Sequence, residues 1–149
     1  MSAVRPSGRL LAIDWGERRI GLALSDETQT LAQPLTTLTR RAGKRFPMAQ
    51  LLELVNRHHV TGIIVGLPLD ESGAEGDAAH AARALADDIK RRAGDVEVTM
   101  WDERMTTARV LAAVREMGGS TRGRKAELDA MAAALLLQHY LDSKRGSAL

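Results

Sequence analysis

Short apolar runs separated by polar and glycine residues predict strands in the first part of the chain. Arg9–Trp15 is an apolar run that reaches a carboxylate at Asp14, and Ile20–Ser25 is a second run that starts four residues later. Such close spacing predicts a β-hairpin. A weaker strand over Leu31–Leu38 would complete a meander, and Pro34 favours an edge position for it because proline has no amide hydrogen to donate to a neighbouring strand.

From Phe46 onward, helical and strand periods alternate. Helical spacing over Phe46–His59 places His59 on an apolar face, where a core histidine is the common case. We expect the remaining elements in this order: a buried strand over 61–66, a helix over 78–93, a fifth strand over 96–101, a helix from Thr106 or Thr107 to Met117, and a last helix over 126–141.

The order of these elements indicates the fold class. Hairpin-linked strands come first, and the later alternation of helices and strands implies parallel crossovers. We therefore predict an α/β fold with a five-stranded mixed sheet flanked by helices. At 149 residues with 44% hydrophobic content, the chain fits a single domain over 1–149, with 1–8 and 143–149 as flexible ends.

Composition excludes several classes of protein. Cysteine is absent, which excludes disulfides, thiolate nucleophiles and zinc bound by cysteine. No apolar run approaches the roughly 18 to 20 residues that span a bilayer, and the first residues lack the apolar stretch of a signal peptide. We expect a cytoplasmic protein with no membrane partner.

The small net charge of +2 hides an uneven distribution. Residues 1–45 carry a net +4, residues 46–103 a net −6, and residues 104–149 a net +4. Two basic ends therefore flank an acidic middle, and a polyanionic partner is compatible with the sequence if the fold brings the two ends together.

Acidic residues stand where sites usually form in α/β sheets. Asp14, Asp102 and Glu103 follow apolar strands, and alternation sends Asp102 and Glu103 to opposite faces, which leaves open which of them reaches a shared site. Asp129 shares a helix face with small residues such as Ala133, which would bring it close to the sheet. Two simpler interpretations stay open: strand-end acids that cap a helix or meet solvent, and a first-turn Asp129 stabilised by the helix dipole.

Three converging carboxylates would suit a hard divalent cation. Without cysteine and without a convincing histidine set, the donors favour Mg²⁺ or Mn²⁺, and such ions point to phosphate chemistry. His58 and His59 diverge by about 100° on a helix, and His80 and His139 are isolated, so we assign none of the four histidines a catalytic role.

Basic residues accompany each acid. Arg18 and Arg19 lie in the predicted hairpin turn and Arg104 follows Glu103, while the group Arg122, Arg124 and Lys125 precedes Asp129. We interpret these residues as phosphate contacts. With four aromatic residues in the chain, broad base-stacking platforms are not expected, and recognition should depend on backbone, shape and metal.

Four motifs in a fixed order resemble the bacterial YqgF/RuvX family. They are Ile13–Ala23 (IDWGERRIGLA), Val65–Leu69 (VGLPL) with Gly73, Asp102–Thr107 (DERMTT) with Ala108, and Arg122–Lys125 (RGRK) with Asp129, Ala132 and Ala133. The resemblance implies an RNase H-like fold related to RuvC-type Holliday junction resolvases. It also implies that Asp14, Glu103 and Asp129 are the catalytic, metal-binding acids, which selects Glu103 over Asp102.

The resemblance implies a metal-dependent nuclease acting on structured RNA, in maturation of the 5′ end of precursor 16S rRNA. In that function Thr106 and Thr107 would shape the turn after Glu103, and Gly16 would let the substrate backbone approach. The alternatives are a Holliday junction resolvase acting on branched DNA, and a non-catalytic nucleic-acid-binding factor in ribosome assembly or transcription. An actin-like ATPase would need two such domains. Contact with ribosomal particles and a monomeric or homodimeric state are further expectations.

Overall fold

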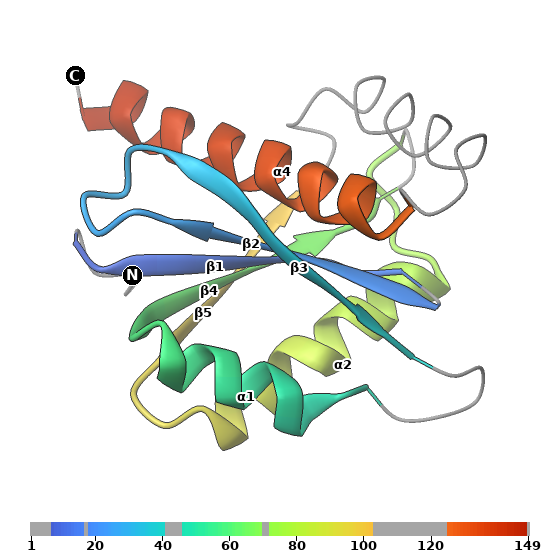
Figure 1. Cartoon of the computed structure of the whole chain (residues 1–149). Helices are drawn as coiled ribbons and strands as arrows, with labels where there is room; N and C mark the ends of the chain where they lie inside the picture. Colours follow the sequence, from blue (N-terminus) through green and yellow to red (C-terminus); the bar gives the residue numbers. More distant parts are fainter. Residues whose placement is uncertain (1–6, 17, 41–45, 70–71, 103–124, 149) are drawn as a thin grey trace.

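The computed structural model describes residues 7–16, 18–40, 46–69, 72–102 and 125–148 (Figure 1). The helix predicted between Thr106 and Met117 lies outside these residues. The described elements are β1 (Arg9–Asp14), β2 (Arg19–Ser25), β3 (Ala32–Thr39), α1 (Met48–Arg57), β4 (Val60–Leu67), α2 (Asp77–Arg92), β5 (Glu97–Asp102) and α4 (Lys125–Ala148).

The five strands form one mixed sheet in the order β3-β2-β1-β4-β5. β1 and β2 form the predicted antiparallel hairpin, and β3 continues it as an edge strand. β4 lies parallel to β1, and β5 lies parallel to β4, as crossovers through helices require. The register between β2 and β3 shifts beside Pro34, where an edge strand tolerates the missing donor. The predicted fold class, with a five-stranded mixed sheet, and the predicted hairpin are confirmed.

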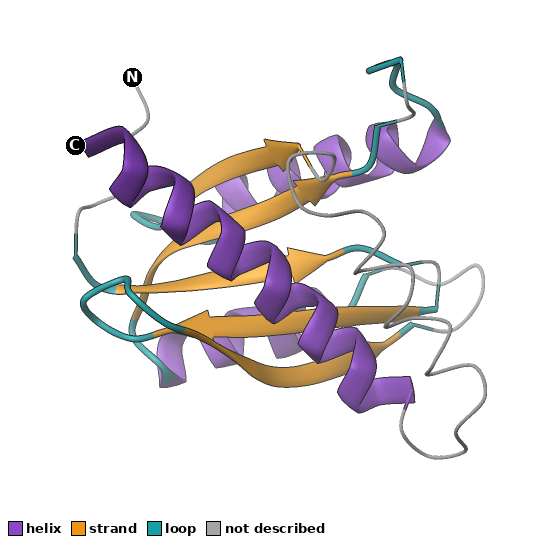
Figure 2. Cartoon of the chain, turned by 90° about the horizontal axis from the view of Figure 1, so that it is seen from above, coloured by secondary structure: helices purple, strands orange, loops and turns teal. Residues whose placement is uncertain are grey.

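Helices cover the two faces of the sheet unequally. α4 crosses one face, over β1, β2 and β3, whereas α1 and α2 lie on the other face (Figures 1 and 2). Successive β1 residues accordingly enter different cores: Leu11 and Ile13 pack in the core that α1 and α2 cover, and Leu10 and Ala12 pack in the core under α4. Alternation along each strand therefore tells which face a strand-end side chain occupies.

The first helix is shorter than the apolar pattern predicts. α1 ends at Arg57, and the amide of His58 donates to the carbonyl of Leu54 at 3.0 Å. His59 follows in a left-handed conformation with φ of 54° and is exposed, so its predicted place in the core was wrong. The helix stops because the chain must reverse here to enter β4 at Val60.

The last helix is longer than predicted. α4 continues to Ala148 instead of ending near Leu141, so residues 143–148 are helical and are not a loose end. An ion pair between Asp142 and Arg145, and a hydrogen bond from Arg145 Nη1 to the Thr30 carbonyl at 3.2 Å, support this extra length. Among the residues that the structure describes, no helix combines the length and the hydropathy needed to cross a membrane.

Candidate active site

The first candidate acid lies at the end of β1, on the face that α4 covers. Asp14 follows Leu10 and Ala12 in the alternation, and both of these residues pack in the α4 core. The residue is 4% exposed, which is unusual for a carboxylate. A carboxylate in this position requires a cation or hydrogen-bond donors to offset its lost hydration.

The second candidate acid is brought to Asp14 by a glycine. Asp14 and Gly21 are directly paired across β1 and β2, with Cα atoms about 5 Å apart in such a pair. A Cβ atom on Gly21 would overlap the main-chain carbonyl group of Asp129, so α4 lies directly against β2 at this point. The structure therefore brings Asp14 and Asp129 together on one face, as the sequence predicted from the alanines around Asp129.

Arg19 forms an ion pair with the second acid. Its Nε atom donates to Oδ2 of Asp129 at 2.5 Å, and the two side chains are 40% and 15% exposed. Arg19 lies two residues before Gly21 on β2, so both occupy the α4 face. The side chain predicted to contact phosphate thus holds the carboxylate that was predicted to bind metal, and its charge offsets that of Asp129.

Asp102, the last residue of β5, is directed away from the face that α4 covers. Trp101 packs edge-on against Tyr140 of α4, with ring centroids 5.2 Å apart, and also approaches His139 at 6.0 Å. Since Trp101 points to α4, alternation directs Asp102 toward the opposite face, away from Asp14. Glu103 lies outside the described residues.

Asp14 and Asp129 carry carboxylate oxygens, which are the hard donor atoms that Mg²⁺ and Mn²⁺ prefer. The buried position of Asp14 and its closeness to Asp129 are compatible with a divalent cation at this end of the sheet. No group of three or more acidic, histidine or cysteine side chains with metal-binding geometry occurs within the described ranges. A third protein ligand would come from outside those ranges, where Glu103 stands in the sequence.

The remaining predicted site residues are only partly described. Gly16 is required by the turn itself, because a Cβ atom there would overlap the carbonyl oxygen of Arg19. Arg18 is exposed beside this turn, and its carbonyl accepts a hydrogen bond from the Arg40 amide at 2.7 Å. The following residues lie outside the described part of the chain: Arg104, Thr106, Thr107, Arg122 and Arg124. Lys125 begins α4, and its side chain is not described.

A cationic and aromatic group next to Asp14 was missed in the sequence. The Arg40 guanidinium lies over the Trp15 ring, 4.9 Å from its centroid, and Trp15 stacks with Phe46 at 5.9 Å. The available signal was an arginine directly after β3, but its placement depends on the β2–β3 register, which periodicity does not give.

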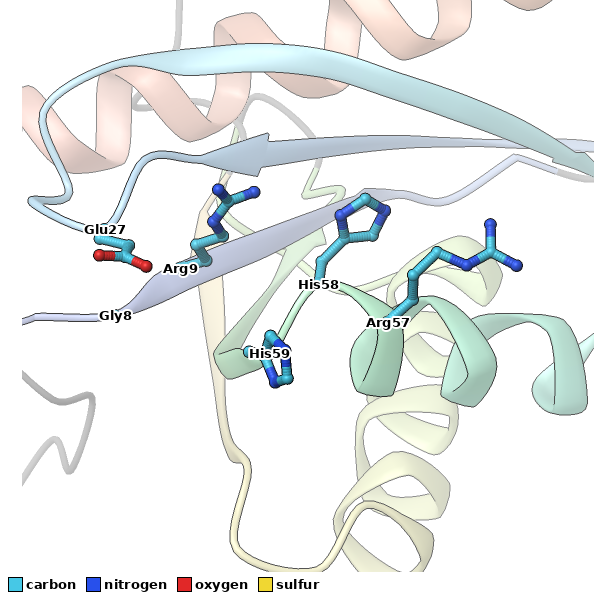
Figure 3. A pocket seen from close by; sticks show the side chains of 6 residues that line it. All are labelled: Gly8, Arg9, Glu27, Arg57, His58 and His59. Carbon is cyan, nitrogen blue, oxygen red and sulfur yellow. The ribbon is translucent and has the colours of Figure 1, made fainter.

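One cavity lies beside the start of α4, which carries Asp129, and another lies at the far end of β1 from Asp14. One, of about 420 Å³, lies between β3 and the start of α4 and is lined by Thr36, Thr37, Glu127 and Met131 among others. The other, of about 200 Å³, lies at the opposite end of β1, where Figure 3 shows Arg9, His58 and Arg57 along one side. A strand as long as β1 spans roughly 17 Å, so His58 and His59 lie far from Asp14.

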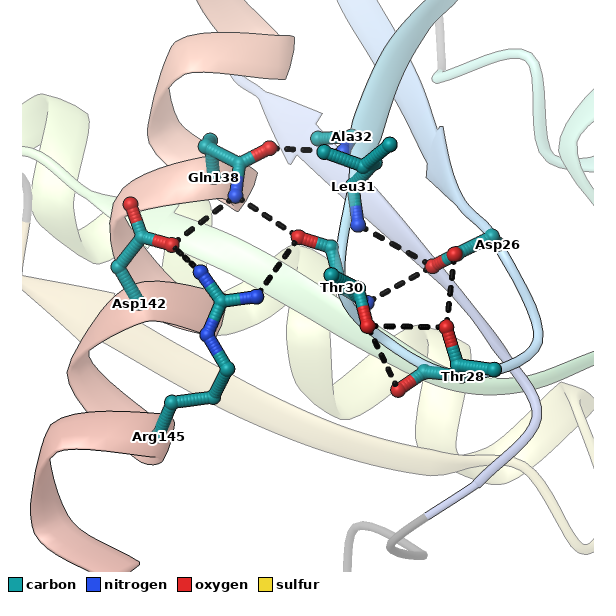
Figure 4. A network of polar contacts seen from close by, with 8 residues as sticks. All are labelled: Asp26, Thr28, Thr30, Leu31, Ala32, Gln138, Asp142 and Arg145. Atoms are coloured by element: carbon teal, nitrogen blue, oxygen red, sulfur yellow. Dashed lines mark hydrogen bonds and ion pairs between the residues drawn. The ribbon is translucent and has the colours of Figure 1, made fainter. Parts of the chain in front are cut away.

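A polar network fixes α4 on the sheet beyond the site (Figure 4). Gln138 accepts a hydrogen bond from the Ala32 amide at 2.9 Å and donates to the Thr30 carbonyl at 3.0 Å. Asp26 closes the same loop: the Thr30 amide and the Thr28 hydroxyl donate to its carboxylate and hold the pKa of Asp26 below its usual value. The network therefore restricts sliding of α4, which carries Asp129.

The chain is similar to known proteins in sequence and in fold. A family model described as RuvX, Holliday junction resolvase, matches residues 8–143. A protein of Acetivibrio thermocellus named "Putative pre-16S rRNA nuclease" is 39% identical over 136 residues, which cover 91% of this chain and 96% of that protein. A Roseiflexus protein of the same name is 38% identical over 93% of this chain and 96% of its own length. Thermus thermophilus RuvC in complex with a Holliday junction substrate has the same fold, with a TM-score of 0.53, 19% identity, and coverage of 94% and 97% of the two chains.

Proposed function

Because this chain belongs to the RuvX family, we propose that it is a metal-dependent nuclease that hydrolyses phosphodiester bonds in structured RNA. The relatives named for pre-16S rRNA direct the proposal to the 5′ end of precursor small-subunit rRNA. Its place of action would be the cytoplasm, on free RNA or on ribosomal particles. The observation that carries the proposal is the approach of Asp129 to the buried Asp14 through Gly21.

The acids would hold Mg²⁺ or Mn²⁺ at the strand ends. Asp14 and Asp129 supply two of the ligands, and Glu103 is the proposed third. The face occupied by Trp101 supports Glu103 over Asp102, because alternation removes Asp102 from the side of α4. When bound, such ions activate a water molecule and stabilise the charge that develops on the phosphate and leaving oxygens.

The protein's own residues would prepare this chemistry in the metal-free state. Burial keeps Asp14 in one place at the end of a central strand, and the Arg19 guanidinium offsets the charge of the Asp129 carboxylate. Arg19 is 40% exposed, so its guanidinium would be able to contact a substrate phosphate if Asp129 held a metal ion in place of the ion pair. Arg18, Arg104, Arg122, Arg124 and Lys125 are the further proposed phosphate contacts, with Gly16, Thr106 and Thr107 shaping the turns between them.

A cleavage assay tests the proposal. End-labelled precursor 16S rRNA with its 5′ leader is incubated with the protein, with Asp14→Asn and with Asp129→Asn, each in Mg²⁺ or Mn²⁺. We expect discrete cleavage by the unmodified protein and at least about a 1000-fold slower reaction with either variant, since loss of a charged group that positions the metals removes several kcal/mol of transition-state stabilisation. The exposed Asp95, between α2 and β5, provides the matched control Asp95→Asn.

Two results would overturn the proposal. Equal cleavage by folded Asp129→Asn would remove Asp129 from the chemistry, and RNA binding without any product or dependence on divalent cations would favour the non-catalytic binding factor. Mapping of the 5′ ends of the products separates endonucleolytic from exonucleolytic action.

The family description favours one second function, Holliday junction resolution. A resolvase must cut two strands symmetrically, which a two-fold dimer does most simply. A four-way DNA junction in the same assay, together with sedimentation of the protein alone and with the junction, distinguishes a symmetric dimeric resolvase from a monomeric ribonuclease.

A further inference from the structure

We propose that Arg40, held against Trp15, binds a substrate phosphate at the strand end that carries Asp14, on the face of the sheet opposite to Arg19. The inference rests on the proposed nuclease function and extends its substrate contacts to a residue outside the motifs that resemble the family. Three observations carry it: where β3 ends, what Arg40 contacts, and which faces of the sheet the two arginines occupy.

The end of β3 brings Arg40 to the acids' end of the sheet. Thr39, the last residue of β3, pairs with Arg19, and the next amide, that of Arg40, donates to the Arg18 carbonyl at 2.7 Å. This bond fixes the backbone of Arg40 next to the turn that carries two predicted phosphate contacts. Three arginines thus come from two strands to one end of the sheet.

Aromatic contact limits the freedom of the Arg40 side chain. Its guanidinium lies 4.9 Å from the centroid of the Trp15 ring, within the range of cation–π attraction. Trp15 is itself supported by Phe46, with the rings inclined by 22°. A guanidinium held in this way loses less side-chain entropy when it binds a phosphate.

The two faces of the sheet distinguish Arg40 from Arg19. Arg19 reaches Asp129 on the α4 face, whereas Trp15 and Phe46 pack with the core on the α1 and α2 face. Asp14 lies on the α4 face at the end of β1, directly before Trp15 in the chain. Positive charge therefore lies on both faces of the sheet at the strand end that carries Asp14, as a nucleic-acid backbone crossing the strand ends would require.

The contact predicts a measurable effect on binding that is separate from cleavage. A fluorescein-labelled RNA hairpin with a single-stranded 5′ extension is titrated in Ca²⁺ with the unmodified protein, Arg40→Gln and Arg40→Lys, at several salt concentrations. We expect about tenfold weaker binding for Arg40→Gln and a salt slope reduced by about one, because one phosphate contact is lost. Arg40→Lys should restore the slope and recover only part of the affinity, because lysine keeps the charge without the planar stack.

A fluorescence signal and a matched control complete the design. In a Trp101→Phe background, Trp15 is the single tryptophan, and its emission should change on RNA binding in the protein with Arg40 and much less with Arg40→Gln. Arg91→Gln removes an equally charged residue from the exposed end of α2, where Asp88 keeps its second partner Arg92. Circular dichroism melting of every variant confirms that it is folded.

The outcomes separate the two proposals. The role of Arg40 is overturned if Arg40→Gln binds RNA with wild-type affinity and salt slope. It is also overturned if Arg91→Gln loses as much affinity as Arg40→Gln. Neither result bears on the proposed nuclease function. Binding that depends on Arg40 with no cleavage in Mg²⁺ or Mn²⁺ overturns the nuclease function and supports the contact. Failure of the unmodified protein to bind the RNA overturns both.

Discussion

Gly21 of β2 and Asp129 of α4 lie in direct main-chain contact, closer than any residue with a side chain at position 21 would allow. Gly21 is also the strand partner of Asp14. One glycine therefore sets the separation of the two candidate ligands, and its role is steric rather than conformational. The contact links the packing of α4 to the geometry of the site.

Replacing Gly21 by alanine should disturb both stability and activity. The added methyl group must displace the α4 main chain, which typically costs about 1–3 kcal/mol of unfolding free energy. A displacement of about 1 Å at Asp129 would also slow cleavage by up to about 100-fold. Urea denaturation and the RNA cleavage assay measure the two effects.

The control for this change is Gly76→Ala. A Cβ atom at Gly76 would meet no atom within 4 Å, so this variant should keep wild-type cleavage and lose only a few tenths of a kcal/mol at the start of α2. If Gly21→Ala behaved like Gly76→Ala, α4 would be free to move and Gly21 would not set the site geometry.

Much of this arrangement was predictable because it follows from periodicity. The apolar run that reaches Asp14 and the close second run predicted the hairpin, and the hairpin is observed. The alanines that share a face with Asp129 predicted the close approach of the last helix, and Ala132 and Ala133 are indeed fully buried. The hairpin and the close packing of the last helix could be predicted because each depends on a pattern within one short stretch of sequence.

What could not be predicted depends on contacts between distant residues. The pairing of Arg19 with Asp129 joins residues 110 positions apart, and a sequence pattern gives each of them a role without revealing that they meet. The place of Arg40 depends on a strand register with a shift beside Pro34. His59 is not in the core because α1 ends at Arg57 and the chain turns toward β4 before the helical pattern of the sequence ends. Hydrophobic periodicity alone does not predict where such a turn occurs.

Loss of the Gln138 side chain should loosen α4 from the β2–β3 loop. In Gln138→Leu the Ala32 amide and the Thr30 carbonyl lose partners, at an expected cost of about 1–2 kcal/mol in unfolding free energy. Hydrogen exchange of the Ala32 amide should be faster in Gln138→Leu than in wild type. Gln50→Leu, on the exposed face of α1, is the matched control, and equal stability of the two variants would show that the network of Figure 4 does not fix the helix.

The Asp26 carboxylate should make stability depend on pH in acid. Hydrogen bonds from the Thr30 amide and the Thr28 hydroxyl lower the pKa of Asp26 from 3.8, so its ionised form is favoured in the folded state. The stabilisation is therefore complete above the unfolded pKa and is lost as pH falls through the lower folded pKa. Thermal melting of wild type and Asp26→Asn should differ at pH 7, and the difference should shrink as pH falls below 3.8 through the folded pKa. A difference that stays constant with pH would contradict the charge as its cause.

Arg19 should compete with divalent cations for Asp129. Without metal, Arg19→Gln removes the ion pair and should lower the unfolding free energy by at most about 1 kcal/mol, because Arg19 is 40% exposed. The same change frees Oδ2 of Asp129, so Mn²⁺, measured by calorimetry on the protein without nucleic acid, should bind more tightly to Arg19→Gln than to wild type. Arg91→Gln should leave Mn²⁺ affinity unchanged. Weaker Mn²⁺ binding in Arg19→Gln would contradict this competition. It would mean that Arg19 orients the Asp129 carboxylate for the metal, both before and after Mn²⁺ binds.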